Sequence, residues 1–508
     1  MREICKEYKK QIQELLNNKV YINCVILIAI LSYGFAISNF SVGVDDLCFD
    51  RYVTGTYIVS VGRWGTSLLY TIFQIFEFTP FWLEMVVTIL TVMMGIVFSA
   101  FLRKNTGDKL NTFHYTIITS ILISYPMLHQ EFIYQSTNLS VTISNLAFMI
   151  IPVLIYEIYK HHMDSKWFLI FSIIMPFFIS MYESCCQTYM CMVCIIAFLE
   201  VLNGKERRKT TKNAFRYFTI CILVLAIGII INFGIEHVFK TILSQNGISQ
   251  KNYSTKMIIW RYFNEVNVFK IFKIYFIDKI ANDFINTNYI RNFFILGIFA
   301  LIFAICKAIK EKKYSLIFFM LGIIGANFII NILQARILYR VDTSCCVAIA
   351  FFATFILINI SEKTANKILC ILFSAIVLFQ TKTMNQCFYN DYVRYKKEAN
   401  YMYSIANEII EKCEDTSKPI VYIFKEHNGI HQNRINEDNG WSIINWGKGA
   451  FNEPGTEVTK FMNSLGYNFT TSTNEQVEEL MESKDLLQEN ERIQETEKYI
   501  VVKIDYNI

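Results

Sequence analysis

Apolar residues fall in runs along the chain, separated by short polar segments. Most runs hold about 20 residues, the length of helix that crosses about 30 Å of hydrocarbon. The pattern predicts about eleven membrane-spanning helices and hence a polytopic α-helical membrane protein. The expected spans are 20–40, 80–102, 112–131, 139–159, 167–182, 185–202, 215–236, 292–309, 314–334, 342–360 and 367–384.

Lysine and arginine are concentrated in alternate loops. The amino-terminal segment and the loops RKNTGDK, KHHMDSK, NGKERRKTTKN, KAIKEKK and SEKTANK carry about 20 basic residues, against about four in the short loops between them. Basic loops stay on the cytoplasmic side, so we expect a cytoplasmic amino terminus and, with an odd number of spans, an external carboxyl terminus. The expected location is the cytoplasmic membrane of a bacterium.

Three longer segments are then expected on the outer side. Within residues 41–79, WGTSLLYTIFQIF is too short to span and predicts an interfacial or re-entrant helix. Residues 237–291 interleave basic and aromatic residues, which favours one or two headgroup-level helices over a solvated connector. Residues 385–508 are numerous enough for a small α/β domain. The expected domains are a transmembrane part, 1–384, and an extracytoplasmic α/β domain, 385–508.

The tail shows both helical and strand periods. NDYVRYKKEANYMYSIANEIIEK predicts a helix, KPIVYIF a strand, TEVTKFMNSLGY a helix that ends at Gly466, and KYIVVKID a closing strand. His427 and His431 are four residues apart beside Gly and Asn, which favours a loop over a metal site.

Composition excludes other classes of protein. A chain with 53% hydrophobic and 15% aromatic residues is not a soluble globular protein, and a net charge of +5 is too small to indicate nucleic-acid binding. The 14 cysteines include one C-x-x-C, Cys191 to Cys194, inside an apolar run. We expect these to be ordinary buried cysteines instead of a metal or redox site.

The order of several motifs resembles the serotype-converting glucosyltransferases of phages and bacteria, a polytopic family that modifies surface polysaccharides. The matching pieces are DDLCFDRY and GRW in the first outer segment, PFFISMYESCCQ, LQARILYRVD, and, in the tail, NDYVRYKKEANYMYSIANEI, KPIVYIF and SIINWGKGAF. The resemblance implies the membrane-embedded GT-C architecture, with a catalytic aspartate in the first outer loop. It also implies transfer of a hexose, glucose by resemblance alone, to a surface glycan.

The chemistry of the outer face agrees with this resemblance. No nucleotide sugar is supplied there, so the donor is expected to be a polyprenyl-phosphate sugar, transferred with inversion. Phosphate leaves without a general acid, and a carboxylate is needed to take the proton of the acceptor hydroxyl. Asp45 and Asp46 are the candidate bases, with Asp46 preferred. The alternative is that an aspartate here only caps a helix.

Other polar residues at the same face are candidates for substrate binding. Arg336 and Arg340 share a helix face and could hold the lipid phosphate, or extend to headgroups. Arg63 could bind the phosphate and Trp64 the sugar, or the indole could anchor the interface. Further candidates for substrate binding are Tyr182, Glu183 and Arg51, and His129, Gln130 and Glu131 lie on the same face.

Two other functions fit the sequence less well. A transporter or flippase of lipid-linked sugars would need charges or broken helices near the bilayer midplane, where few occur. A membrane scaffold would leave the outer Asp and Arg residues without a purpose. Metal dependence stays open: the paired aspartates could hold Mg²⁺ or Mn²⁺, although the resemblance implies an architecture in which lipid-phosphate donors often react without a metal.

Overall fold

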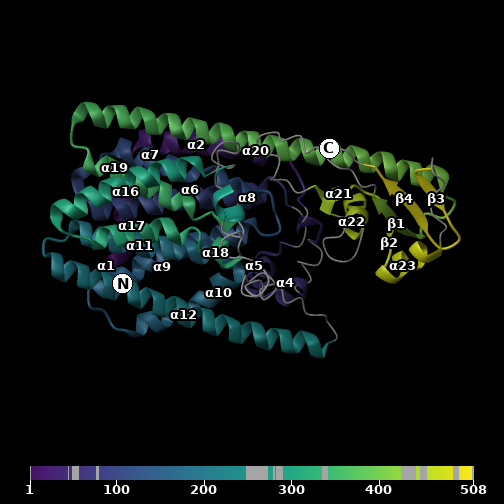
Figure 1. The fold of residues 1–508 in the computed structure, drawn as a ribbon, viewed down its shortest axis with the longest axis horizontal. Coiled ribbons are helices and arrows are strands. Elements are labelled where there is room, and N and C mark those ends of the chain that lie inside the picture. The colour runs from purple at the N-terminus through teal and green to yellow at the C-terminus, as the bar shows by residue number, and fades with distance from the viewer. Residues whose placement is uncertain are drawn as a thin grey trace. The chain divides into compact units, whose positions relative to one another are not determined.

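The computed structural model describes residues 2–43, 45–48, 56–75, 79–246, 273–278, 281, 290–334, 341–424, 442–446, 455–483 and 491–505 (Figure 1). Within these residues, seven helices are long and apolar enough to cross a membrane. They are α2 (Lys19–Ser38), α6 (Trp82–Thr106), α9 (Asn138–Lys160), α11 (Cys186–Asn203) with its preceding turn η4 (Glu183–Cys185), α12 (Arg207–Gln245), α16 (Arg291–Glu311) and α20 (Lys363–Lys412).

Four further apolar helices are shorter: α7 (Thr112–Ile123), α10 (Lys166–Met181), α17 (Ser315–Ala326) and α19 (Cys345–Asn359). Each predicted span coincides with one of these long or short helices. The prediction of a polytopic helical membrane protein is therefore confirmed. The count of about eleven crossings stays a prediction, because four of the helices are shorter than a full span.

The predicted end of the third span is wrong. We expected it to continue to residue 131, whereas α7 ends at Ile123. Pro126 causes the break, because proline disfavours helical backbone in the residue before it, and Tyr125 is accordingly extended with ψ 123°. The chain continues through the turn η3 (Pro126–Leu128) and the short helix α8 (His129–Phe132). Glu131 therefore lies between two spans.

The chain forms two compact units, and each unit consists of three separate segments of the chain. Unit 1 consists of Met1–Ser38, Arg51–Phe132 and Thr137–Asn385. Unit 2 consists of Asn39–Asp50, Ile133–Ser136 and Gln386–Ile508. The first predicted outer loop thus divides between the units, and its aspartate pair belongs with the carboxyl-terminal part of the chain.

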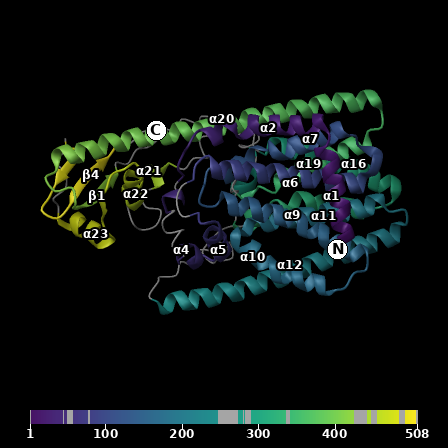
Figure 2. The same cartoon turned by 180° about the vertical axis from the view of Figure 1, so that it is seen from behind.

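Unit 1 is a bundle of apolar helices. Its centre is α11, which packs against α9, α12 and α17, while α19 packs against α7 and α16. Buried aromatic rings fill the contact between α11 and α19, where the Phe198 and Phe355 centroids are 4.9 Å apart. The amphipathic helix α1 (Arg2–Leu16) packs against α2 and α6 (Figure 2) and is tied to α6 by an ion pair between Glu14 and Arg103.

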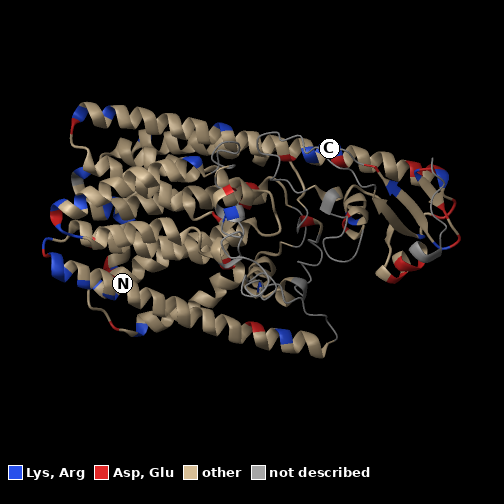
Figure 3. Cartoon of the chain, in the orientation of Figure 1, with Lys and Arg blue, Asp and Glu red and all other residues tan. Residues whose placement is uncertain are grey.

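Charge is distributed unevenly along the bundle. Lysine and arginine gather at the end of unit 1 where α6 ends and α12 and α20 begin. The middle parts of the helices are almost free of charge (Figure 3). This is the end formed by the loops that are predicted to be cytoplasmic. The orientation itself remains a prediction.

Unit 2 contains a four-stranded sheet with strand order β2-β1-β4-β3. β1 (Pro419–Phe424) is parallel to β2 (Thr470–Thr471) and to β4 (Ile500–Ile504), and β3 (Ile493–Glu495) is antiparallel to β4. The predicted strands KPIVYIF and KYIVVKID coincide with β1 and β4. Three helices accompany the sheet: α21 (Ile443–Trp446), α22 (Thr456–Ser464) and α23 (Asn474–Ser483).

The predicted interfacial helix coincides with α5 (Trp64–Phe73), which follows α4 (Thr56–Ser60). Most of the predicted headgroup-level segment, and His427 and His431, lie outside the described residues. One part of that segment that is described is the continuation of α12 to Gln245, beyond the predicted end at residue 236.

Candidate active site

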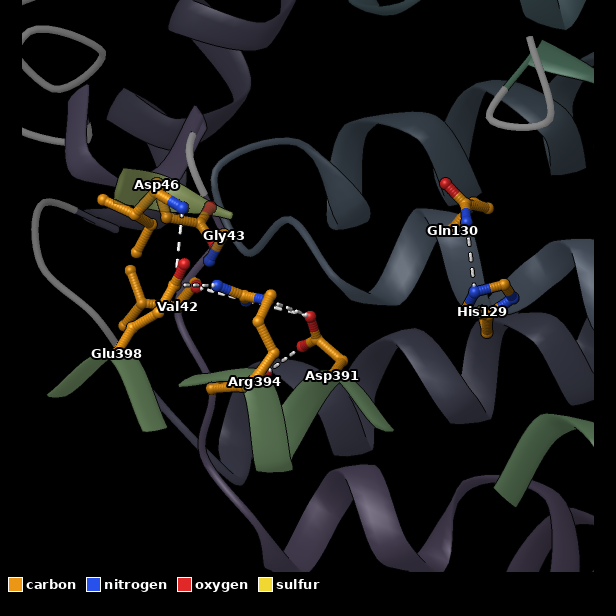
Figure 4. Close-up of polar contacts among 10 residues, drawn as sticks. Val42, Gly43, Asp46, His129, Gln130, Asp391, Arg394 and Glu398 are labelled. Carbon is orange, nitrogen blue, oxygen red and sulfur yellow. Dashed lines mark hydrogen bonds and ion pairs between the residues drawn. The ribbon is translucent and has the colours of Figure 1, made fainter. Parts of the chain in front are cut away.

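Asp46 lies in unit 2, in the short helix η1 (Asp45–Cys48) (Figure 4). Its Oδ2 accepts a hydrogen bond of 3.0 Å from the Gly43 amide, and its Oδ1 accepts one of 2.9 Å from the Ser136 amide. The side chain is only 1% exposed. A Cβ on Gly43 would lie 2.8 Å from the Tyr134 ring, so glycine is needed for this approach. Asp46 therefore joins two segments that are distant in sequence.

These contacts bear on the helix-cap alternative. Asp46 is inside η1 and its side chain bonds back to the preceding turn and across to Ser136, so it does more than cap a helix. Two backbone donors fix the plane of the carboxylate. The side chain of Asp45 lies outside the described residues, so the choice between the two aspartates stays a prediction.

A second group of candidates comes together in unit 1. The Arg63 guanidinium lies over the Tyr182 ring, 4.8 Å from its centroid. The indole of Trp64 donates a hydrogen bond of 3.0 Å to Asn232 of α12. Glu183, which is exposed, follows Tyr182 directly and interacts electrostatically with Arg63. Four residues chosen from separate motifs thus form one cluster, although their roles remain predictions.

The backbone explains why Arg63 and Trp64 are placed there. The Gly65 amide donates to Ser180 Oγ at 2.9 Å, and Thr66 Oγ1 donates to the Met181 carbonyl at 2.9 Å. These bonds fasten the first turn of α5 to the end of α10. Gly62 has φ +90° and passes so close to Glu236 that a Cβ would lie 2.9 Å from its carboxyl carbon. The sequence GRWG is therefore required by geometry at both glycines.

A buried polar network surrounds Glu131 in unit 1. Glu131 Oε1 accepts a hydrogen bond of 2.9 Å from Asn145, whose Oδ1 accepts one of 2.7 Å from Thr188. Burial raises the pKa of Glu131 to about 8, and bonds from Thr343 and Asn145 partly oppose the rise. Glu131 was expected on the outer face, whereas Asn145 and Thr188 were not chosen as candidates, since single polar residues in an apolar run carry no spacing pattern.

The motif LQARILYRVD is described only at its ends. Arg336 and Arg340 lie outside the described residues, as does Arg51. On either side, the Ile330 amide donates to Gln187 Oε1 at 3.1 Å and Gln187 Nε2 donates to the Val341 carbonyl at 2.5 Å. Asp342, 1% exposed, accepts a bond from Asn331. Asp342 was within a quoted motif but was not chosen as a candidate.

A site for Mg²⁺ or Mn²⁺ on the aspartate pair stays a prediction, since the side chain of Asp45 lies outside the described residues. The described residues contain no group of three His, Cys, Asp or Glu side chains that could hold a metal ion. Both oxygens of Asp46 accept a backbone amide proton.

Comparison with known families gives one match over this region. The family described as Glucosyl transferase GtrII matches residues 34–358. The match covers more than half of the 508 residues and includes every candidate discussed above. No curated protein and no solved structure matches the chain.

Proposed function

The chain belongs to the Glucosyl transferase GtrII family and is a membrane glucosyltransferase, and on this premise we propose its donor, acceptor and mechanism. The resemblance carried by its motifs is thereby confirmed. The donor in our proposal is a polyprenyl-phosphate hexose, with glucose as the sugar. The acceptor is a hydroxyl group of a cell-surface polysaccharide on the outer face of a bacterial cytoplasmic membrane.

In the proposed reaction, the acceptor oxygen bonds to the anomeric carbon of the donor while the bond from that carbon to the phosphate oxygen breaks. The bonding electron pair leaves with the phosphate, and the acceptor proton passes to the Asp46 carboxylate. Attack opposite to the leaving group inverts the anomeric configuration. A positioned carboxylate base contributes about 10²- to 10⁴-fold to such a step.

The observation that carries this proposal is the fixed orientation of Asp46 by the Gly43 and Ser136 amides. A carboxylate that must receive a proton at one moment of the reaction gains from being oriented before substrate arrives. Since Asp46 is 1% exposed, the segments around it must open for the acceptor hydroxyl to reach it. This requirement is part of the proposal.

The leaving phosphate needs cations. Arg63 is the described residue we assign to it, because a guanidinium can donate to two phosphate oxygens at once. We assign Trp64 to stacking on the sugar ring and Glu183 to accepting from its hydroxyls. Tyr182 is buried with the Arg63 guanidinium over its ring, so we assign it to holding Arg63 at the substrate. Arg336 and Arg340 are further proposed phosphate ligands, from the sequence alone.

The membership of the family does not favour the alternative of a lipid-linked sugar transporter. The multi-pass arrangement is consistent with a donor that arrives in the bilayer. We propose that the amino terminus is cytoplasmic and that the sheet of unit 2 is extracytoplasmic, where the second substrate is a polymer.

Transfer in proteoliposomes tests this function. Polyprenyl-phosphate glucose and a panel of surface glycans would be supplied to wild type, Asp45→Asn and Asp46→Asn, and the anomer of the product would be read by NMR. We expect Asp46→Asn to abolish transfer and the product to be inverted. Asp164→Asn, an exposed aspartate paired with Lys166, is the matched control and should transfer normally. Normal transfer by Asp46→Asn would show that Asp46 is not the base.

A further inference from the structure

A buried ion group in α20 lies outside both the family match and the proposed chemistry. Arg394 donates to Asp391 Oδ1 at 2.9 and 3.1 Å and to Glu398 Oε2 at 2.7 Å. Residues three and four apart on a helix share one face, so the two carboxylates bracket the guanidinium (Figure 4). The side chains of Arg394, Asp391 and Glu398 are 9%, 2% and 0% exposed.

Stability alone does not explain this group. Taking three charges out of water costs several kcal/mol per ion, and well-packed apolar residues of similar volume are often as stabilising or more so. What a buried arginine adds is direction, because its planar fork presents donors at fixed angles. Besides its two carboxylate partners, Arg394 can therefore fix the position of a third group.

The third group that Arg394 binds is the Val42–Gly43 peptide, which lies next to the candidate base Asp46. Arg394 Nη2 donates a hydrogen bond of 2.9 Å to the carbonyl of Val42. That carbonyl and the amide of Gly43 belong to one peptide unit, which is planar and trans. The Gly43 amide donates to Asp46 Oδ2 at 3.0 Å. The guanidinium and the carboxylate thus hold opposite ends of the same rigid plane.

Two further contacts hold the loop segment that leads to Val42. Ser41 Oγ donates a hydrogen bond of 2.6 Å to Asp391 Oδ2, the oxygen not used by Arg394. The Phe40 ring packs edge-on against Tyr395 at 6.0 Å, and Tyr395 also contacts Phe461 of α22 at 6.0 Å. The ion group also contacts α21, because the Ile443 amide donates a hydrogen bond of 3.3 Å to Glu398 Oε2. The ion group is the point where these segments of unit 2 meet.

We propose that Arg394 is a positioning residue for Asp46, acting through the Val42–Gly43 peptide, with Asp391 and Glu398 fixing its guanidinium. A hydrogen-bond donor on the Val42 carbonyl polarises the peptide group, and this strengthens the hydrogen bond that the Gly43 amide donates to Asp46. Loss of Arg394 releases the peptide plane, so the carboxylate plane turns with it. The inference rests on the proposed function of Asp46 as base, and it gives the carboxyl-terminal unit a part in catalysis.

Transfer kinetics of purified full-length variants in proteoliposomes test the inference. Arg394→Ala should lower kcat about 100-fold, the effect of roughly 1 Å of misplacement, while the KM for polyprenyl-phosphate glucose stays unchanged. Guanidinium at millimolar concentration should restore kcat of this variant at least about tenfold by refilling the site. Arg394→Lys retains the buried charge without the fork, and should fold and also lose kcat.

Arg492→Ala is the matched control. Arg492 also pairs with a glutamate of α20, Glu408 at 3.4 Å, and stacks on Tyr401 at 4.8 Å. It should keep the wild-type kcat and show no response to guanidinium.

The inference is overturned if folded Arg394→Ala or Arg394→Lys keeps the wild-type kcat, or if guanidinium restores nothing to Arg394→Ala. These outcomes are separate from failure of the proposed function, which Asp46→Asn reports. If Asp46→Asn abolishes transfer and Arg394 variants are normal, the base stands and the positioning role falls. If Asp46→Asn transfers normally, the base assignment itself falls.

Discussion

The side-chain amide of Asn145 donates a hydrogen bond of 2.9 Å to Oε1 of Glu131, and both side chains are buried. The same amide nitrogen lies 3.3 Å from Thr343 Oγ1 as donor. The carboxyl group of Glu131 therefore has polar partners but almost no water, a setting that favours its neutral form. A pH dependence of stability follows, and one substitution should remove it.

Glu131→Gln should flatten the pH profile of stability. The pKa of Glu131 is raised from an ordinary 4.5 to about 8 in the folded protein. Between these values the folded protein keeps a proton that the unfolded chain releases, so the free energy of unfolding falls as pH rises. The contribution is fully present below about pH 4.5 and lost by about pH 8, and is on the order of a few kcal/mol. Glutamine cannot titrate. We expect the Tm of wild type to fall relative to Glu131→Gln between pH 5 and 8.

Thermal unfolding in detergent at several pH values measures this difference. Asp164→Asn is the control, because this aspartate is exposed and should give a curve parallel to that of wild type. Parallel curves for wild type and Glu131→Gln would show that the folded-state pKa of Glu131 is not raised.

Gly65→Ala should destabilise the protein. A Cβ at this position would lie 2.3 Å from Ser180 Oγ and 2.4 Å from the Phe177 carbonyl oxygen, and the backbone atom cannot move without shifting α10. We expect a loss of about 1–3 kcal/mol and reduced transfer, since α5 begins at Trp64. Gly234→Ala in α12 is the control, because nothing lies within 4 Å of its Cβ position, and it should be neutral or stabilising by about 1 kcal/mol. Equal Tm values for Gly65→Ala and wild type would contradict the close approach.

Arg63→Ala should weaken donor binding. A hydrogen bond to a charged group contributes about 1.5–3 kcal/mol, so the KM for polyprenyl-phosphate glucose should rise about 10- to 150-fold. Arg63→Lys should recover only part of this, because an ammonium lacks the fork. Arg207→Ala is the control: Arg207 also lies over a tyrosine, Tyr314 at 5.6 Å, but belongs to a loop predicted to be cytoplasmic. A KM for Arg63→Ala equal to that of wild type would remove Arg63 from the donor site.

The fold was largely predictable because lipid imposes a strong pattern. A helix that faces hydrocarbon must be apolar over its length, so the runs of apolar residues coincide with helices. The error at α7 arose because apolar content continues to residue 128, while Pro126 breaks the backbone at Tyr125. Hydropathy measures apolar content and does not detect a break in the helical backbone.

The candidate site was predictable only in part. Arg63 and Trp64 were chosen in the first outer segment, and Tyr182 and Glu183 where the fifth span was expected to reach the outer face. Unit 1 brings the four together. Arg394 could not be chosen in this way, because its motif predicted only a helix, and its partner is the backbone carbonyl of Val42. A backbone carbonyl has no side-chain identity, so no residue pattern in a single sequence points to it.

Transfer should not depend on a divalent cation. The two oxygens of Asp46 accept hydrogen bonds from the Gly43 and Ser136 amides, and these donors orient the carboxylate without a cation. We expect the wild-type rate to change by less than about twofold when EDTA replaces Mg²⁺ on both sides of the proteoliposome. Permeabilised vesicles are the control for access of the chelator. A rate that falls with EDTA and returns with Mg²⁺ or Mn²⁺ would mean that a cation binds in the working enzyme. Asp45, whose side chain lies outside the described residues, would then be the first residue to test by substitution with asparagine.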